Sequence, residues 1–143
     1  MERNVKDELV KTFNEVFGWF NAHQALLQFS PGKTDWNVKQ VLEHISLANQ
    51  YLLNFVRKGK LVDNHRALAW SKPAHSKPKG RVPIDKIQDT LQLQFKECLQ
   101  HLEKHGEDTG NIDVYHNIYL LVQYARRQLM QLEKIEFEFN LGV

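Results

Sequence analysis

The chain has 143 residues, of which 42% are hydrophobic and 25% are charged, a composition too apolar for an intrinsically disordered protein. Its apolar runs are too short to span a bilayer, and its first residues lack the apolar core of a signal peptide. The single cysteine, Cys98, excludes an intramolecular disulfide and a cysteine-based zinc site. We therefore expect one domain over residues 1–143, located in the cytoplasm and without a membrane partner.

The first half of the chain predicts two helices. Apolar residues recur with helical spacing from Val5 to about Phe29, where the breaker sequence Ser30–Gly32 is expected to end the first helix. The second helix is expected to follow Asn37, a favourable N-cap residue, and to end at Gly59.

A strongly basic segment follows at residues 57–81, which hold eight lysines or arginines and one acid although the whole chain has a net charge of only +2. Prolines at 73, 78 and 83 argue against regular structure, so we expect a long basic loop between the second and third helices. Clustered cations can bind nucleic acid. This segment carries no recognisable nucleic-acid-binding motif, however, and nucleic acid is therefore not an expected partner.

Two further helices are predicted after the loop. The third starts near Pro83 and ends at Gly106, and the fourth runs from about Asp113 to Phe139. No strand-like alternation of apolar and polar residues remains. Four amphipathic helices must bury their apolar stripes against each other, so we predict an all-α fold, a four-helix bundle with a long connection between helices two and three.

Several polar residues share the phase of the buried stripes. His44 falls among the apolar positions of the second helix, and a polar row lies along the inner edge of the fourth: Asn117, Tyr124, Gln128 and Gln131. Buried amide and imidazole groups need hydrogen-bond partners, because an unsatisfied one costs on the order of 1–3 kcal/mol. Two readings stay open, a structural polar network and a binding site.

Two segments resemble signatures of one known family. Residues 36–45, WNVKQVLEHI, are similar to the second-helix signature of the DinB-like (DinB/YfiT) superfamily, and residues 123–131, QYARRQLMQ, resemble its fourth-helix signature. The resemblance implies a four-helix bundle that often forms homodimers. It also implies a metal held by one histidine of helix two and by two histidines, four residues apart, of helix four.

Only one of the three implied metal ligands is present. His44 is retained, whereas Tyr124 and Gln128 stand at the two histidine positions of helix four, next to the matching residues Arg127 and Gln131. A phenol ionises near pH 10, and a carboxamide is a weak neutral donor for zinc or nickel. We therefore expect no metal cofactor; weakly bound zinc or nickel is the alternative.

We expect His44, Tyr124 and Gln128 to line a pocket inside the bundle. His23 is predicted at the edge of the first helix's apolar stripe, from which it could face this pocket. The other residues expected next to the pocket are Asn117, Arg127 and Gln131. We expect a non-catalytic small-molecule-binding or interaction protein that forms a homodimer, as the resemblance implies. The alternative is a metal-dependent thiol transferase or hydrolase with a site rebuilt around His44.

Overall fold

The computed structural model describes residues 4–32, 35–62, 78–105 and 112–142, and every regular element in these ranges is helical. No strand occurs among the described residues, so the predicted all-α class is confirmed. The elements in chain order are α1 (Val5–Gly18), the 3₁₀ turn η1 (Trp19–Asn21), α2 (Gln24–Leu27), α3 (Val38–Lys58), α6 (Ile84–His105) and α7 (Ile112–Leu141).

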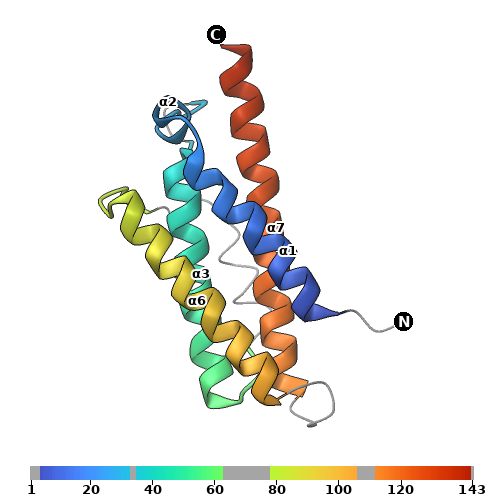
Figure 1. The fold of residues 1–143 in the computed structure, drawn as a ribbon. Coiled ribbons are helices and arrows are strands. Elements are labelled where there is room, and N and C mark those ends of the chain that lie inside the picture. Colours follow the sequence, from blue (N-terminus) through green and yellow to red (C-terminus); the bar gives the residue numbers. More distant parts are fainter. Residues whose placement is uncertain (1–3, 33–34, 63–77, 106–111, 143) are drawn as a thin grey trace.

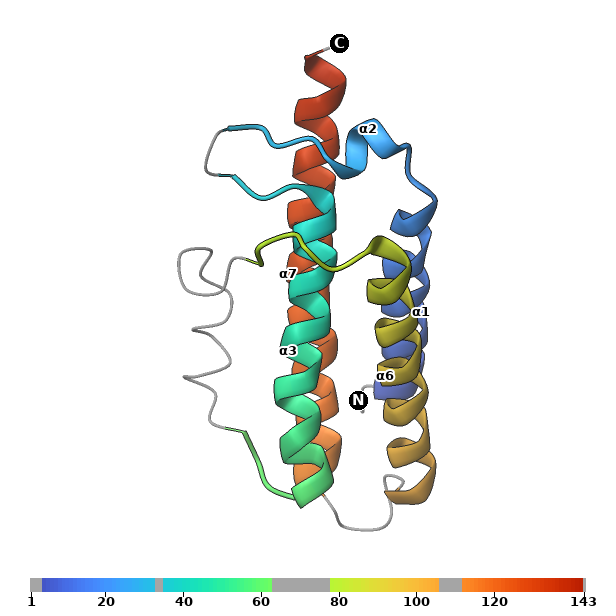
Figure 2. The same ribbon diagram turned by 90° about the vertical axis from the view of Figure 1, so that its left-hand side faces the viewer.

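The four long helices lie side by side (Figures 1 and 2). Helices α3 and α6 run in the same direction, opposite to that of α1 and α7. Helix α3 packs most extensively against α7, and α1 and α6 close the group through contacts with α7 and α3 respectively.

Local signals in the sequence set the ends of α3. The Asn37 side chain accepts a hydrogen bond from the Gln40 amide at 2.8 Å, and the Gln40 side chain accepts one from the Asn37 amide at 3.0 Å. This reciprocal capping box satisfies two amides that the helix itself leaves free. At the other end Gly59 adopts a φ of 66°, the left-handed conformation that ends helices and favours glycine. Both predicted ends of this helix are therefore confirmed.

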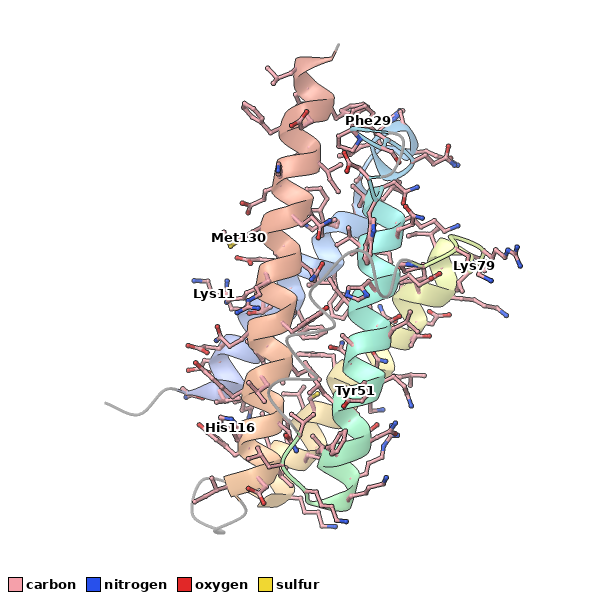
Figure 3. All side chains as sticks on the ribbon, turned by 180° about the vertical axis from the view of Figure 1, so that it is seen from behind. Lys11, Phe29, Tyr51, Lys79, His116 and Met130 are labelled. Atoms are coloured by element: carbon pink, nitrogen blue, oxygen red, sulfur yellow. The ribbon has the colours of Figure 1, made fainter. Side chains whose placement is uncertain are left out.

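The predicted first helix is wrong beyond Gly18. The chain makes the η1 turn there and then restarts as the short helix α2, where the Nδ1 atom of His23 accepts a hydrogen bond from the Ala25 amide at 3.2 Å. The segment after Gly18 turns across the end of the molecule, and Phe29 packs edge-to-face on Phe139 with ring centroids 5.2 Å apart. Figure 3 shows Phe29 beside the C-terminal part of α7.

The other predicted helices match the structure within a few residues, and their apolar stripes form the core. Phe13 of α1 stacks on Phe95 of α6 with centroids 5.6 Å apart, and Cys98 is fully buried in the same core. The core also contains apolar residues of α3 and α7 that recur at helical spacing, which are Val38, Val41, Ile45, Ala48, Leu52, Val114, Ile118, Leu121, Ala125, Leu129, Leu132 and Ile135.

The described end of the basic loop is fastened to the start of α3. The Gln40 side chain donates a hydrogen bond to the Pro78 carbonyl at 2.9 Å, and Lys39 donates one to the Gly80 carbonyl at 3.2 Å. These contacts position the chain for the start of α6. Most of the predicted loop, residues 63–77, lies outside the described ranges.

Each described helix is too short or too polar to traverse a lipid bilayer.

Candidate functional site

The centre of the candidate site is a hydrogen bond between α3 and α7. The Nε2 atom of His44 and the hydroxyl oxygen of Tyr124 lie 2.5 Å apart. His44 is 1% exposed and Tyr124 is 6% exposed, so the bond lies inside the protein. The sequence phase predicted that both side chains point inward, and the structure brings them together across the most extensive helix contact of the fold.

The Tyr124 phenol is neutral, and burial disfavours its ionisation further. Desolvation raises the pKa of Tyr124 well above its usual value of 10, and the nearby charge of Arg127 only partly opposes this effect. A charged phenolate is unfavourable in such surroundings, because a buried charge loses its hydration. Tyr124 therefore acts as a hydrogen-bonding hydroxyl at physiological pH.

The ring of Trp36 holds the other side of His44. The two rings meet edge-to-face with centroids 4.8 Å apart and planes at 84°. Trp36 directly precedes the N-cap residue Asn37, so the start of α3 fixes the position of the indole. The indole of Trp36 and the hydroxyl of Tyr124 thus both contact the imidazole.

Gln128 lies one helical turn beyond Tyr124 on α7 and is 4% exposed, as its phase predicted. Its side-chain oxygen is buried and has no hydrogen-bond partner among the described residues. A buried carbonyl oxygen in this condition costs about 1–3 kcal/mol relative to a satisfied one. The polar row is therefore not a fully satisfied structural network within the described part of the chain.

Asn117, which lies two turns before Tyr124 on α7, has a structural function. Its Nδ2 atom donates to the Lys60 carbonyl at 2.6 Å, and its Oδ1 atom accepts from the Val62 amide at 2.9 Å. The fully buried side chain thus fastens the start of the basic connection to α7. The polar groups of Asn117 are thus engaged with the main chain of the connection and not with His44, Tyr124 or Gln128.

The other three pocket-adjacent candidates separate in the structure. His23 is exposed and caps α2, so its predicted place on the first helix is wrong. Arg127 is exposed on α7, one residue before the buried Gln128. Gln131 is half-buried and is the only one of the three that lines a described pocket.

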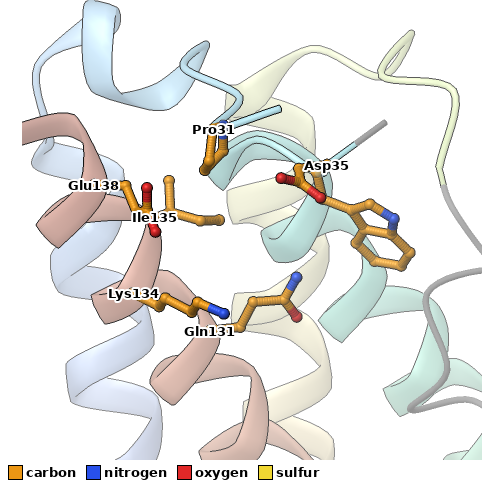
Figure 4. A pocket seen from close by; sticks show the side chains of 7 residues that line it. Pro31, Asp35, Gln131, Lys134, Ile135 and Glu138 are labelled. Atoms are coloured by element: carbon orange, nitrogen blue, oxygen red, sulfur yellow. The ribbon is translucent and has the colours of Figure 1, made fainter. Parts of the chain in front are cut away.

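That pocket, which we name the Trp36 pocket, has a volume of about 370 Å³ and lies between α7 and the chain before α3. Figure 4 shows Asp35 and Glu138 on opposite sides of it, with Gln131 and Lys134 along its lower edge. Its complete lining is Pro31, Asp35, Trp36, Gln131, Lys134, Ile135 and Glu138.

The charged lining of the Trp36 pocket was missed by the sequence analysis. Pro31 and Asp35 lie between predicted helices, where hydrophobic periodicity gives no information. Lys134 and Glu138 are spaced by one turn on α7, the same spacing that Gln131 and Ile135 show, and this i, i+4 pattern was the available signal. It indicates a shared face but not what covers that face.

The set formed by His44, Tyr124 and Gln128 does not fit a zinc or nickel centre. No group of three or more histidines, cysteines or acids that could hold a metal occurs among the described residues. His44 directs its Nε2 atom at the neutral hydroxyl of Tyr124, and Gln128 supplies only a neutral amide. Transition-metal sites in proteins use thiolate, imidazole and carboxylate ligands, and this set has one of them.

Comparisons of the chain with models of known protein families, with curated proteins and with solved structures found no significant match.

Proposed function

We propose that the chain is a DinB-like four-helix bundle whose metal centre has been replaced by the His44–Tyr124 hydrogen bond, and that it works as a non-catalytic small-molecule-binding protein. The observation that carries this proposal is the 2.5 Å contact between the imidazole and the phenol inside the core. The two residues stand at positions that the family resemblance assigns to metal ligands. Here they bind each other.

The chemistry of Tyr124 and Cys98 supports binding rather than catalysis. A general acid or base works best when its pKa lies near the operating pH. Burial raises the pKa of Tyr124 and so moves it further above physiological pH. Cys98 is also a poor nucleophile, because burial raises its pKa to about 12. The Trp36 pocket, next to the indole that contacts His44, is the place we assign to the small molecule.

The experiment that tests the replaced metal centre restores the two missing histidines. The variant Y124H/Q128H is expected to bind zinc, because His44 and two histidines one turn apart on α7 would then supply three imidazoles. The matched control, Q123H/R127H, places a histidine pair with the same spacing on less buried positions of α7 and should bind zinc more weakly. Adding His44→Ala to Y124H/Q128H should abolish the gain.

The same zinc titration can also show that the proposal is wrong. If Y124H/Q128H keeps its helical circular dichroism spectrum but binds zinc no better than Q123H/R127H, positions 124 and 128 do not correspond to the family's ligand positions. The proposed relationship to the DinB-like superfamily would then be wrong.

A further inference from the structure

We propose that the Trp36 pocket binds a small zwitterion of amino-acid size, a molecule with one ammonium group, one carboxylate group and an apolar body. This inference rests on the proposed small-molecule binding and gives its ligand class, but it does not depend on the argument about the metal. It follows from three properties of the pocket: its unpaired charges, its apolar wall and its volume.

Both signs of charge occur at the pocket, and they do not neutralise each other. Asp35, Lys134 and Glu138 are exposed, and none of the three has an ion-pair partner among the described residues. Lys134 and Glu138 are one turn apart on α7, a spacing at which ion pairs commonly form, yet they do not pair here. A ligand ammonium group can bind either carboxylate, while a ligand carboxylate can bind Lys134.

The wall between these charges is apolar. Trp36 and Ile135 are each 4% exposed, so they form a well-packed surface, and Pro31 lies at the edge. An aromatic or aliphatic ligand body resting on this wall would remove mainly its own apolar surface from water, because Trp36 and Ile135 expose little of theirs. The half-buried Gln131 adds an amide that can both donate and accept hydrogen bonds.

The size of the pocket limits the ligand. A volume of about 370 Å³ is near the lower end of the range found for small-molecule sites. It suits a molecule of amino-acid size. A dicarboxylate would bring a carboxylate against Asp35 or Glu138, and a diamine, which can pair with both carboxylates, would leave Lys134 unpaired. A zwitterion is the class that pairs with both signs of charge in the lining.

The experiment compares three probes that share one phenyl ring: L-phenylalanine, phenethylamine and 3-phenylpropionate. Binding is measured by NMR titration of the tryptophan indole N–H signals, which single Trp→Phe variants assign. The signal of Trp36 should shift, because the ligand's ring would lie against it. The signal of Trp19 is an internal control, since Trp19 lines a different pocket on the other side of α7.

L-Phenylalanine is expected to bind tighter than either singly charged probe by a factor of about 1.5 to 5, the contribution of one exposed ion pair. Lys134→Gln should remove its advantage over phenethylamine, and the double substitution D35N/E138Q should remove its advantage over 3-phenylpropionate. The control Lys96→Gln makes the same charge change at an exposed position of α6 that does not line the pocket, and should leave all three dissociation constants unchanged.

The outcomes separate this inference from the proposed function. If the three probes shift Trp36 with equal dissociation constants, the zwitterion class is wrong while small-molecule binding at the pocket stands. If no probe shifts Trp36, or if Trp19 shifts instead, both the ligand class and the assignment of this pocket as the binding site are wrong. Because the substituted charged residues are exposed, the variants are expected to fold normally.

Discussion

The contribution of the His44–Tyr124 hydrogen bond to stability can be measured with Tyr124→Phe. This substitution removes one oxygen atom and keeps the ring, so the packing between α3 and α7 changes little. The Nε2 atom of His44 loses the hydroxyl that lies 2.5 Å away. Any loss of stability therefore reports on the hydrogen bond and not on a new cavity.

The expected magnitude follows from the burial of both partners. His44 is 1% exposed and Tyr124 is 6% exposed, so water has little access to a ring nitrogen that has lost this partner. Removing one member of a buried polar pair costs about 1–3 kcal/mol, whereas replacing both members by apolar groups costs much less than the two single changes together. The free energy of unfolding of Tyr124→Phe should fall by that amount.

A double-mutant cycle isolates the pair. Urea unfolding of the wild type, Tyr124→Phe, His44→Leu and the double variant should give a coupling energy of about 1–3 kcal/mol between the two positions. The double variant should therefore be more stable than the sum of the single effects predicts. Additive effects, within about 0.5 kcal/mol, would refute the conclusion that the two side chains are bonded in the core.

Three further predictions concern other buried polar groups. Burial raises the pKa of Glu43 above its ordinary value of 4.5, and the Val82 amide and Lys39 only partly oppose this effect. The folded protein therefore disfavours the charged carboxylate. As a result, the free energy of unfolding falls as the pH rises from 4.5 through the raised pKa. Urea unfolding should show that Glu43→Gln is more stable than the wild type at pH 7, and this difference should shrink towards pH 4.5. A difference that does not depend on pH would contradict this prediction, as would the same behaviour in the exposed control Glu103→Gln. Asn117→Ala should lower the free energy of unfolding by about 1–3 kcal/mol and speed hydrogen exchange of the Val62 amide. Unchanged exchange would contradict the conclusion that Asn117 fastens the connection to α7. Gln128→Met should be at least as stable as wild type, because it removes a buried oxygen without a described partner, and a loss above about 1 kcal/mol would show that this oxygen is satisfied.

Much of the fold could be predicted because its helix ends carry local signals. Asn37 and Gly59 act within one turn of the chain, so the sequence around them is sufficient to place both ends of α3. The break after Gly18 was not predicted, because apolar residues continue at helical spacing on both sides of it. The turn there lets Phe29 reach Phe139, a contact between residues distant in sequence that periodicity does not report.

Part of the candidate site could also be predicted from the sequence. Helical phase alone placed His44 and Tyr124 inside the protein, since the two helices that carry them are long and regular. The function of Asn117 was not predictable, because its partners are main-chain atoms of Lys60 and Val62 in an irregular segment. The Trp36 pocket was missed for a similar reason, as part of its lining comes from the chain between α2 and α3.

The most direct test of the replaced metal centre is the metal content of the wild-type protein, prepared without a histidine tag from cells supplied with zinc and nickel. If His44 is bonded to a neutral phenol, elemental analysis should find well under one equivalent of either metal per chain, and His44→Ala should not change this content. Near-stoichiometric metal that is lost in His44→Ala would contradict the account and would favour a metalloenzyme built around this histidine.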